Sequence, residues 1–96
     1  MTRTVRTDIY YYIYDNDEED MIWYSPSSDD KQKQHRNLRN CIDEARRILC
    51  RNPAADIQIY GRATDICGGY EDGNEYDYLV GDPSDFDRLE KYLKGE

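Results

Sequence analysis

The segment from residue 5 to residue 14, V-R-T-D-I-Y-Y-Y-I-Y, constrains the fold of this chain more than any other. Its β-branched and aromatic residues alternate at a period of two, which suits a pleated strand. One parity carries Val5, Ile9, Tyr11 and Ile13. The other parity carries Tyr10, Tyr12 and Tyr14. The segment therefore predicts a strand with aliphatic residues on one side and a row of tyrosines on the other.

Tyrosine also decides whether the chain can fold at all. Leucine, isoleucine, valine and phenylalanine account for only 16 of the 96 residues, a fraction typical of disordered chains when the net charge is −8. The chain adds ten tyrosines and one tryptophan, and each such ring buries roughly 150–250 Å². A tyrosine-rich core can replace the missing aliphatic residues, and the length predicts a single domain over residues 1–96.

The middle of the chain predicts a hairpin followed by a helix. The acidic run from residue 15 to 20 interrupts the first strand, and strand-like composition resumes over 21–24. Ser28, Asp29 or Asp30 can cap the helix, and Asn52-Pro53 ends it. Residues 31 to 35 lack apolar anchors, so we expect them to fray. One apolar stripe follows at helical spacing: Leu38, Cys41, Ile42, Ala45, Ile48 and Leu49.

The C-terminal half predicts three short strands and a second helix. The strands are expected over 56–60, 63–70 and 74–80, with turns at Gly61 and at residues 71–73. Asp82-Pro83 is typical of a helix start, and apolar residues at 86, 89, 92 and 93 continue it. The order β-β-α-β-β-β-α predicts an α+β domain, an antiparallel sheet of four to five strands with helices packed on one face.

The residues that could bind metal lack metal-site spacing. His35, Cys41, Cys50 and Cys67 have no closely spaced pair, and Cys41 and Cys50 fall on opposite sides of the predicted helix. The acidic run has Asp20 where a calcium loop of the EF-hand type needs glycine. We expect no bound metal, no cofactor and reduced thiols.

The known catalytic motifs are also missing. The sequence has no G-x-S-x-G, phosphate-binding or dinucleotide-binding motif, and its one histidine lies in a polar stretch. We therefore expect a protein that is not an enzyme. Because no apolar run has the length of a signal peptide or membrane span, we also expect a soluble, cytoplasmic protein.

Charge is distributed unevenly along the chain. Residues 31–51 carry a net charge of +5 and the remaining residues carry −13. The negative field disfavours direct binding of nucleic acid and of anionic membranes. If the sheet and the long helix form opposite sides, the molecule is strongly dipolar.

The candidate partner-binding residues combine the outward tyrosines of the first strand with nearby acids, because tyrosine gives a recognition surface both contact area and a hydrogen-bonding tip. The set comprises Tyr10, Tyr12, Tyr14, Asp15, Asp17, Glu18, Glu19, Asp20, Glu71, Asp72, Glu75 and Asp77. Two alternatives stay open. The tyrosines can instead form a second buried face beneath the C-terminal helix, and the acids can serve solubility alone.

In size, acidity and lack of an enzymatic motif, the chain resembles the small inhibitors that phages and other mobile elements deploy against host defence, notably anti-CRISPR proteins. Several of these are DNA mimics. The resemblance implies a partner with a basic nucleic-acid-binding surface, such as a CRISPR effector, in the cytoplasm of a host cell. Carboxylates two residues apart on a strand lie about 6.6 Å apart, a spacing that can imitate a phosphate row.

Two other functions fit the same composition. One is a protein-interaction module or homodimer subunit that uses the tyrosine-rich face. The other is salt adaptation, which the excess of aspartate over glutamate and of arginine over lysine favours.

We expect Cys41, Cys50 and Cys67 to titrate as free thiols in denaturant. We also expect a metal chelator to leave the melting temperature unchanged, because no metal should contribute to the free energy of unfolding. Thermal melts with and without chelator measure this directly. Loss of the fold on adding chelator would contradict the prediction.

Overall fold

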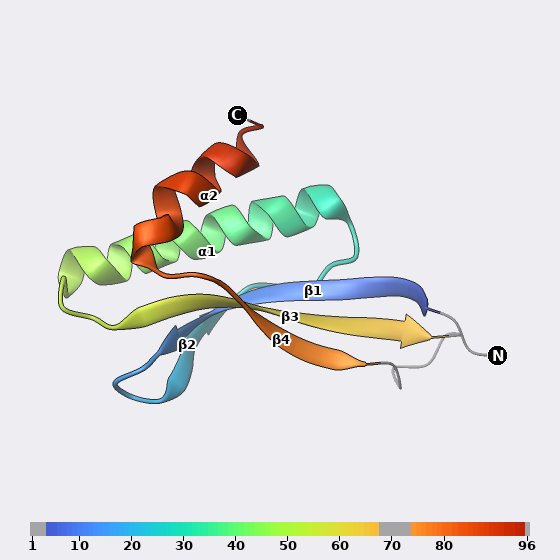
Figure 1. Ribbon diagram of the computed structural model, residues 1–96, viewed down its shortest axis with the longest axis horizontal. Coiled ribbons are helices and arrows are strands. Elements are labelled where there is room, and N and C mark those ends of the chain that lie inside the picture. The colour runs from blue at the N-terminus through green and yellow to red at the C-terminus, as the bar shows by residue number, and fades with distance from the viewer. Residues whose placement is uncertain (1–3, 68–73, 96) are drawn as a thin grey trace.

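The tyrosine-rich segment forms an inner strand of a four-stranded sheet. In the computed structural model, which describes residues 4–67 and 74–95, all neighbouring strands are antiparallel and their order is β2-β1-β3-β4 (Figure 1). In chain order the elements are β1 (Thr4–Asp15), β2 (Asp20–Tyr24), α1 (Lys31–Arg51), β3 (Ile57–Cys67), β4 (Glu75–Gly81), the short 3₁₀ helix η1 (Pro83–Asp85) and α2 (Phe86–Leu93).

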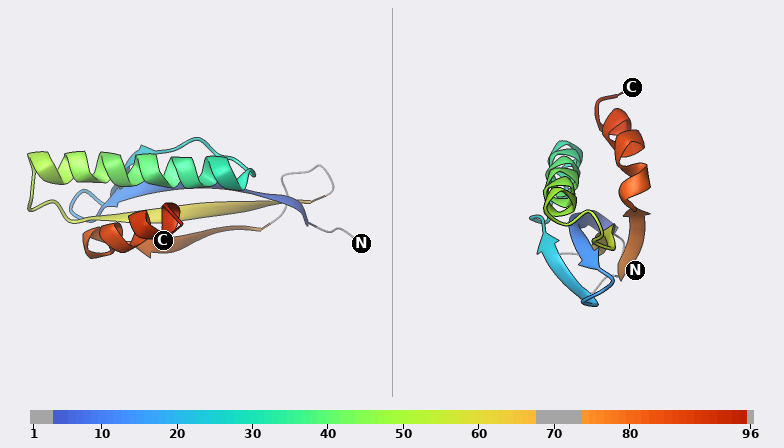
Figure 2. Two further views of the ribbon diagram at one scale, coloured as in Figure 1. Left: turned by 90° about the horizontal axis from the view of Figure 1, so that it is seen from above. Right: turned by 90° about the vertical axis from the view of Figure 1, so that its left-hand side faces the viewer.

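Both helices lie on the same face of the sheet (Figure 2). The predicted α+β class is therefore confirmed, with the element order β-β-α-β-β-α and one strand fewer than the sequence pattern indicated. We call the face opposite α1 and α2 the outer face.

The predicted helical stripe forms the core. Leu38, Cys41, Ile42 and Ala45 are buried against Ile13, Ile57 and Ile59 of the sheet, with Phe86 and Leu93 of α2 in the same cluster. Burying one large aliphatic side chain stabilises a fold by about 1.5–3 kcal/mol. Ile13, Ile42 and Ile59 in this cluster are fully buried.

Helix α1 begins and ends where the sequence indicated. The Asp30 side chain accepts a hydrogen bond from the Gln32 backbone N–H, and Asn52 caps the other end. The expected fraying of residues 31 to 35 is wrong. Gln34 donates a side-chain hydrogen bond to the Ser28 carbonyl at 2.8 Å, and the ring of His35 lies 5.7 Å from that of Tyr92. These polar and aromatic contacts replace the apolar anchors that the segment lacks.

The predicted turn at Gly61 is also wrong. Residues 57–60 and 63–67 of the two expected strands belong to one strand, β3, and Gly61 lies inside it opposite Tyr78 of β4. Residues 68–70 of the second expected strand lie outside the described residues. The Tyr78 ring crosses this position so closely that a Cβ at residue 61 would lie 2.5 Å from its Cζ atom. Gly61 therefore permits a close approach instead of a turn. The expected turn at 71–73 lies outside the described residues.

Gly61→Ala should destabilise the fold by about 1–3 kcal/mol, because the new methyl group overlaps the Tyr78 ring. In a Tyr78→Ala background the same change should be neutral or stabilising, as alanine usually is when it replaces glycine in unstrained backbone. Urea unfolding of the four variants measures the difference. Equal effects of Gly61→Ala in both backgrounds would contradict this role of the ring.

Candidate protein-binding face

The outer face carries a row of side chains that crosses all four strands. In the register of the sheet, Tyr24 of β2 lies opposite Tyr12, Tyr12 opposite Tyr60, and Tyr60 opposite Leu79 of β4. The rings of Tyr12 and Tyr60 are stacked, with centroids 5.5 Å apart. Tyr12 is only 6% exposed, whereas Tyr24 at one end is 69% exposed and Leu79 at the other is 55% exposed. The row is thus packed in its middle and open at both ends.

A second row is polar and is held together by an arginine. Tyr10, Arg62 and Asp77 lie opposite one another on β1, β3 and β4. Arg62 binds both carboxylate oxygens of Asp77, through Nε at 2.6 Å and Nη2 at 2.9 Å, and donates from Nη1 to the Tyr10 hydroxyl at 2.8 Å. Its guanidinium also lies over the rings of Tyr10 and Tyr12. Arg62 therefore neutralises Asp77 and fixes two of the tyrosines.

This arrangement shifts the pKa values of its members. The Arg62 guanidinium, helped by the Tyr12 hydroxyl at 2.9 Å, holds the pKa of the Asp77 carboxyl below its usual value. Burial, followed by the hydrogen bond to Asp77, raises the pKa of Tyr12 to about 12. Tyr12 therefore stays protonated and donates its hydrogen bond throughout the physiological pH range.

The acidic hairpin joins β1 to β2 at one edge of the outer face. We use this name for residues 15–20. The Asp15 carboxylate accepts hydrogen bonds from the backbone N–H groups of Asp17 and Glu18, which shapes the turn. Asp15 and Asp20 lie directly opposite each other in register, and like charges in such a pair are destabilising. Within the described part of the chain, no carboxylate of this hairpin forms an ion pair.

The structure brings together only part of the predicted binding set. Tyr10, Tyr12 and Tyr14 share the outer face, and Tyr14 adjoins the acidic hairpin, with its ring edge-on to Tyr60. The predicted acids do not form one surface. Glu71 and Asp72 lie outside the described residues, and Asp77 is engaged by Arg62. Glu75 pairs with Thr64, whereas Asp15 pairs with Ile57, so seven strand residues, about 23 Å along the strand direction, lie between these two acids.

The alternative in which the C-terminal helix covers the tyrosines is wrong. Helix α2 packs beside α1, where Arg46 binds both Asp87 and Glu90, and its Phe86 joins the core on the opposite face. Among residues 4–67 and 74–95, no helix covers the outer face (Figure 2). Only the tyrosines and their polar partners shield one another there.

Sequence reasoning missed several residues of this face. Tyr60 and Arg62 point to the same side of β3. The sequence prediction ended the strand at Gly61, so it could not place these two residues on one face. Tyr24 and Met21 belong to the predicted second strand, yet only the register shows that they oppose Tyr12 and Tyr14. Reading residues 57–67 as one alternating strand would have found the β3 residues.

The remaining candidate residues are the metal-ligating and thiol side chains. Across the described ranges, no three His, Cys, Asp or Glu side chains are grouped so that they could hold a metal ion. Cys41 is buried, which raises the pKa of its thiol to about 12, and Cys50 is exposed, on opposite sides of α1 as expected. Neither α1 nor α2 is both long enough and apolar enough to cross a bilayer.

Comparisons of this chain with protein-family models, curated proteins and solved structures find no match. The geometry of the outer face is therefore the basis for a functional assignment.

Asp77→Asn should lower the pKa of Tyr12, because it removes a negative charge beside the hydroxyl and leaves Arg62 to favour the tyrosinate. A tyrosine pKa raised from 10.0 to about 12 stabilises the fold below pH 10 and loses that contribution as the pH rises to 12. The variant should therefore lack part of this contribution below pH 10 and lose less stability than the wild type as the pH rises from 10 to 12.

Carbon-13 NMR titration of the tyrosines measures the pKa, and urea unfolding at pH 9 to 12 measures the stability. Glu75→Gln is the matched control, since it removes the same charge from β4 at a residue paired with Thr64 and not with Arg62. Equal shifts in the two variants would contradict a specific contact between Tyr12 and Asp77.

Proposed function

We propose that this chain is a binding protein without enzymatic activity, which docks through its outer face and acidic hairpin on a basic surface of a partner protein. The observation that carries the proposal is the row of Tyr24, Tyr12, Tyr60 and Leu79, which no described helix covers and which is exposed at both ends. Next to it stand hairpin carboxylates that have no ion-pair partner among the described residues. Aromatic anchors with a charged rim are typical of protein-binding surfaces.

The charges favour a cationic partner. Asp15 and Asp20 face each other at a cost in stability, and a basic side chain placed between them would relieve it. The cationic helix α1 lies on the far side of the sheet (Figure 1), so the hairpin is the part of the described molecule that such a partner would meet first. Complementary charge of this kind increases the rate of association and makes it sensitive to salt.

A partner of this type need not be a nucleic-acid-binding protein, but the compositional resemblance to phage inhibitors favours one. In that case the hairpin would occupy the groove that otherwise binds nucleic acid. Asp77 would take no part, because Arg62 already neutralises it. The mimicry we propose is thus confined to the hairpin and does not extend across the sheet.

The second candidate is self-association through the same face. It is favoured by the two exposed ends of the row, Tyr24 and Leu79, and opposed by the net charge of −8 on each copy. Sedimentation equilibrium distinguishes the two. A dimer that Tyr24→Ala disrupts and Tyr92→Ala preserves would favour self-association, because Tyr92 is a similarly exposed tyrosine on α2.

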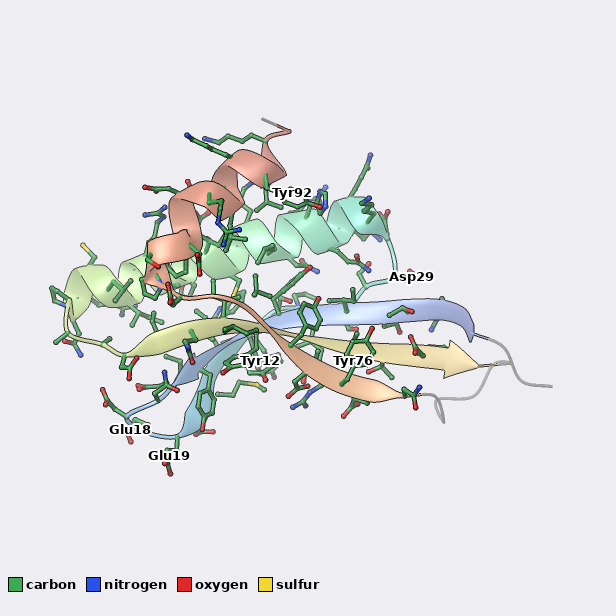
Figure 3. The ribbon with its side chains drawn as sticks, in the orientation of Figure 1. Tyr12, Glu18, Glu19, Asp29, Tyr76 and Tyr92 are labelled. Carbon is green, nitrogen blue, oxygen red and sulfur yellow. The ribbon has the colours of Figure 1, made fainter. Side chains whose placement is uncertain are left out.

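Reversal of the hairpin charge, Glu18→Lys with Glu19→Lys, should weaken binding of a captured partner by about tenfold or more, equivalent to about 1.4 kcal/mol. Both residues are exposed in the turn, so the melting temperature should change little (Figure 3). The partner would first be captured from the native host cell with the wild-type protein. Affinities would then be compared by calorimetry at 50 and 500 mM salt.

Asp29→Lys with Asp43→Lys is the matched control. Both residues are exposed, and the double change likewise moves the net charge from −8 to −4. Asp29 lies at the other end of the molecule from Glu18 and Glu19 (Figure 3). Equal weakening by both double variants, or affinity independent of salt, would contradict docking through the hairpin. Competition between this protein and DNA for the partner would support mimicry, and simultaneous binding would oppose it.

A further inference from the structure

A cationic hollow lies where the segment between β2 and α1 meets the first turns of α1. It has a volume of about 300 Å³ and is lined by Pro26, Ser27, Ser28, Lys33, Arg36 and Asn37. Its two charged lining residues are both cations, and no carboxylate lines it. The segment leads into Asp29, which lies at the far end of the molecule from Glu18 and Glu19 (Figure 3). The hollow is therefore remote from the acidic hairpin.

The two cations are not neutralised by an ion pair. Lys33 and Arg36 are exposed, and neither forms an ion pair with another described residue. Asp29 and Asp30 are the carboxylates closest to the lining in the sequence, and neither belongs to it. The Asp30 carboxylate accepts a hydrogen bond from the Gln32 backbone N–H at 3.3 Å. Because Lys33 and Arg36 are three positions apart on a helix, both side chains can reach one ligand.

The two serines add hydroxyl donors to the same hollow. The Ser28 hydroxyl oxygen accepts a hydrogen bond from the Asp30 backbone N–H at 3.1 Å, and its own O–H can still donate. Ser27 is exposed, and a serine hydroxyl can turn toward a ligand. A guanidinium, an ammonium and two hydroxyls form a set of donors that complements an oxygen-rich anion.

Hydrogen bonds hold the wall of the hollow in place. Asn37 is only 8% exposed and donates from its side-chain amide to the Pro26 carbonyl at 3.1 Å. Gln34 donates to the Ser28 carbonyl at 2.8 Å. The backbone of Ser28 also exchanges two hydrogen bonds with Ile9 of β1. The segment is therefore tied to both α1 and β1 before any ligand arrives.

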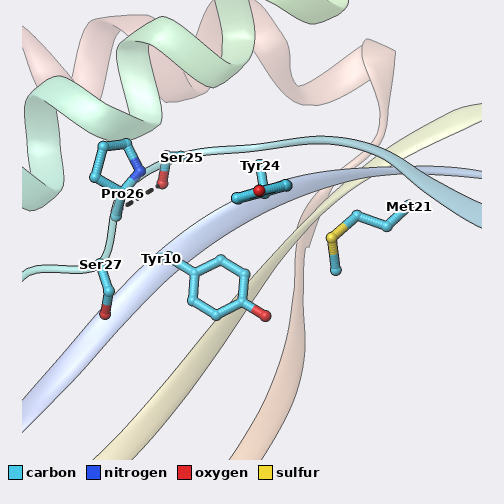
Figure 4. A pocket seen from close by; sticks show the side chains of 6 residues that line it. All are labelled: Tyr10, Met21, Tyr24, Ser25, Pro26 and Ser27. Carbon is cyan, nitrogen blue, oxygen red and sulfur yellow. Dashed lines mark hydrogen bonds between the residues drawn. The ribbon is translucent and has the colours of Figure 1, made fainter.

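The other side of the same segment is uncharged. Pro26 and Ser27 also border a groove whose remaining lining residues are Tyr10, Met21, Tyr24 and Ser25 (Figure 4). The buried Ser25 hydroxyl donates to the Pro26 carbonyl at 3.0 Å. Neither hollow that adjoins Pro26 and Ser27 is thus lined by a carboxylate that would repel an anion.

We propose that the cationic hollow binds a phosphate group. The planar guanidinium of Arg36 would bind two of its oxygens, as arginine does in phosphate sites, and Lys33 would add a second positive charge. The hydroxyls of Ser27 and Ser28 would donate to the remaining oxygens. The volume is near the lower limit of the roughly 300–1,000 Å³ typical of ligand sites, which fits a phosphate group and a small part of the molecule that carries it.

The net charge of the chain does not prevent this binding. The total of −8 repels anions at long range. At physiological salt, charges more than about 8 Å apart are largely screened, whereas contacts at hydrogen-bonding distance are much less affected. The proposed site goes beyond docking through the acidic hairpin and does not depend on it.

The test measures phosphate binding by nitrogen-15 NMR at a constant ionic strength of about 150 mM. The reporters are the backbone amides of Ser27 and Ser28 and the Nε–H of Arg36. The probes are inorganic phosphate, the peptide acetyl-Gly-phosphoserine-Gly-amide and adenosine 5′-monophosphate. Acetate, the unphosphorylated peptide and adenosine are the matched controls. We expect saturable shifts with all three phosphate probes, binding of acetate at least about fivefold weaker, and no saturable shift with the two uncharged controls.

The phosphate probes also identify the source of the group. Tighter binding of the phosphopeptide than of the nucleotide would support the site and indicate a phosphorylated protein. The reverse order would support the site and indicate a nucleotide or nucleic acid. Acetate binding as tightly as phosphate, or shifts that do not saturate with any phosphate probe, would overturn the proposal.

Lys33→Gln with Arg36→Gln should weaken phosphate binding about tenfold or more, because it removes two charge-assisted contacts. Lys31→Gln with Arg39→Gln is the matched control. It removes the same charge from two exposed residues of α1 outside the lining, so we expect a change of less than about twofold. Equal weakening by the two double variants would overturn the site in favour of a general effect of charge.

Two milder variants keep the test independent of folding. Arg36→Lys retains the charge but loses the planar fork, so its affinity should lie between those of wild type and the Lys33, Arg36 double variant. Ser27→Ala leaves the charge unchanged and should weaken binding about threefold by removing a donor. Both residues are exposed, so the melting temperatures should change little. Wild-type affinity in both folded variants would overturn the proposed contacts.

Discussion

The structure depends on how few aliphatic side chains the chain has. They suffice to cover only one of the two faces of the sheet. The stripe on α1 and the apolar residues of α2 pack over Ile13, Ile57 and Ile59, and little remains for the other side. Tyrosines cover that side by packing on one another, so that Tyr12 is buried although no described helix lies over it. Each ring needs a polar partner for its hydroxyl. The fold and the candidate site therefore use the same side chains.

Sequence periodicity predicted those elements whose inward and outward residues follow the regular spacing of a strand or a helix. The alternation in β1 placed the tyrosines on one face, and the helical spacing from Leu38 to Leu49 identified the core. Sequence spacing alone could not tell a glycine that makes a turn from one that lets a neighbouring side chain approach the backbone closely. Gly61 looks like a turn residue, but it lies where the Tyr78 ring crosses β3, and that contact joins residues 17 positions apart.

The candidate site was predictable to the same extent. Its three β1 tyrosines followed from parity alone, whereas the contact between Arg62 and Asp77 depends on the register of β3 and β4. Counting charges along the chain treated Asp77 as part of a negative surface. The pairing removes it from that surface, so that the described acids of the predicted set are left in the hairpin and at Glu75, about 23 Å farther along the strands, a separation of seven strand residues.

The hydrogen bonds of the outer face bear on how it would meet a partner. The hydroxyls of Tyr10, Tyr12 and Tyr60 are already bonded to Arg62, Asp77 and Gln58, so these rings have little rotational freedom left to lose. Immobilising a flexible side chain on association costs about 0.5–1.5 kcal/mol, and here that cost falls mainly on the ends of the row. A surface set in advance cannot reshape itself around different partners. In the proposed docking, it would select a partner whose contour already matches, and any adjustment would fall to that partner.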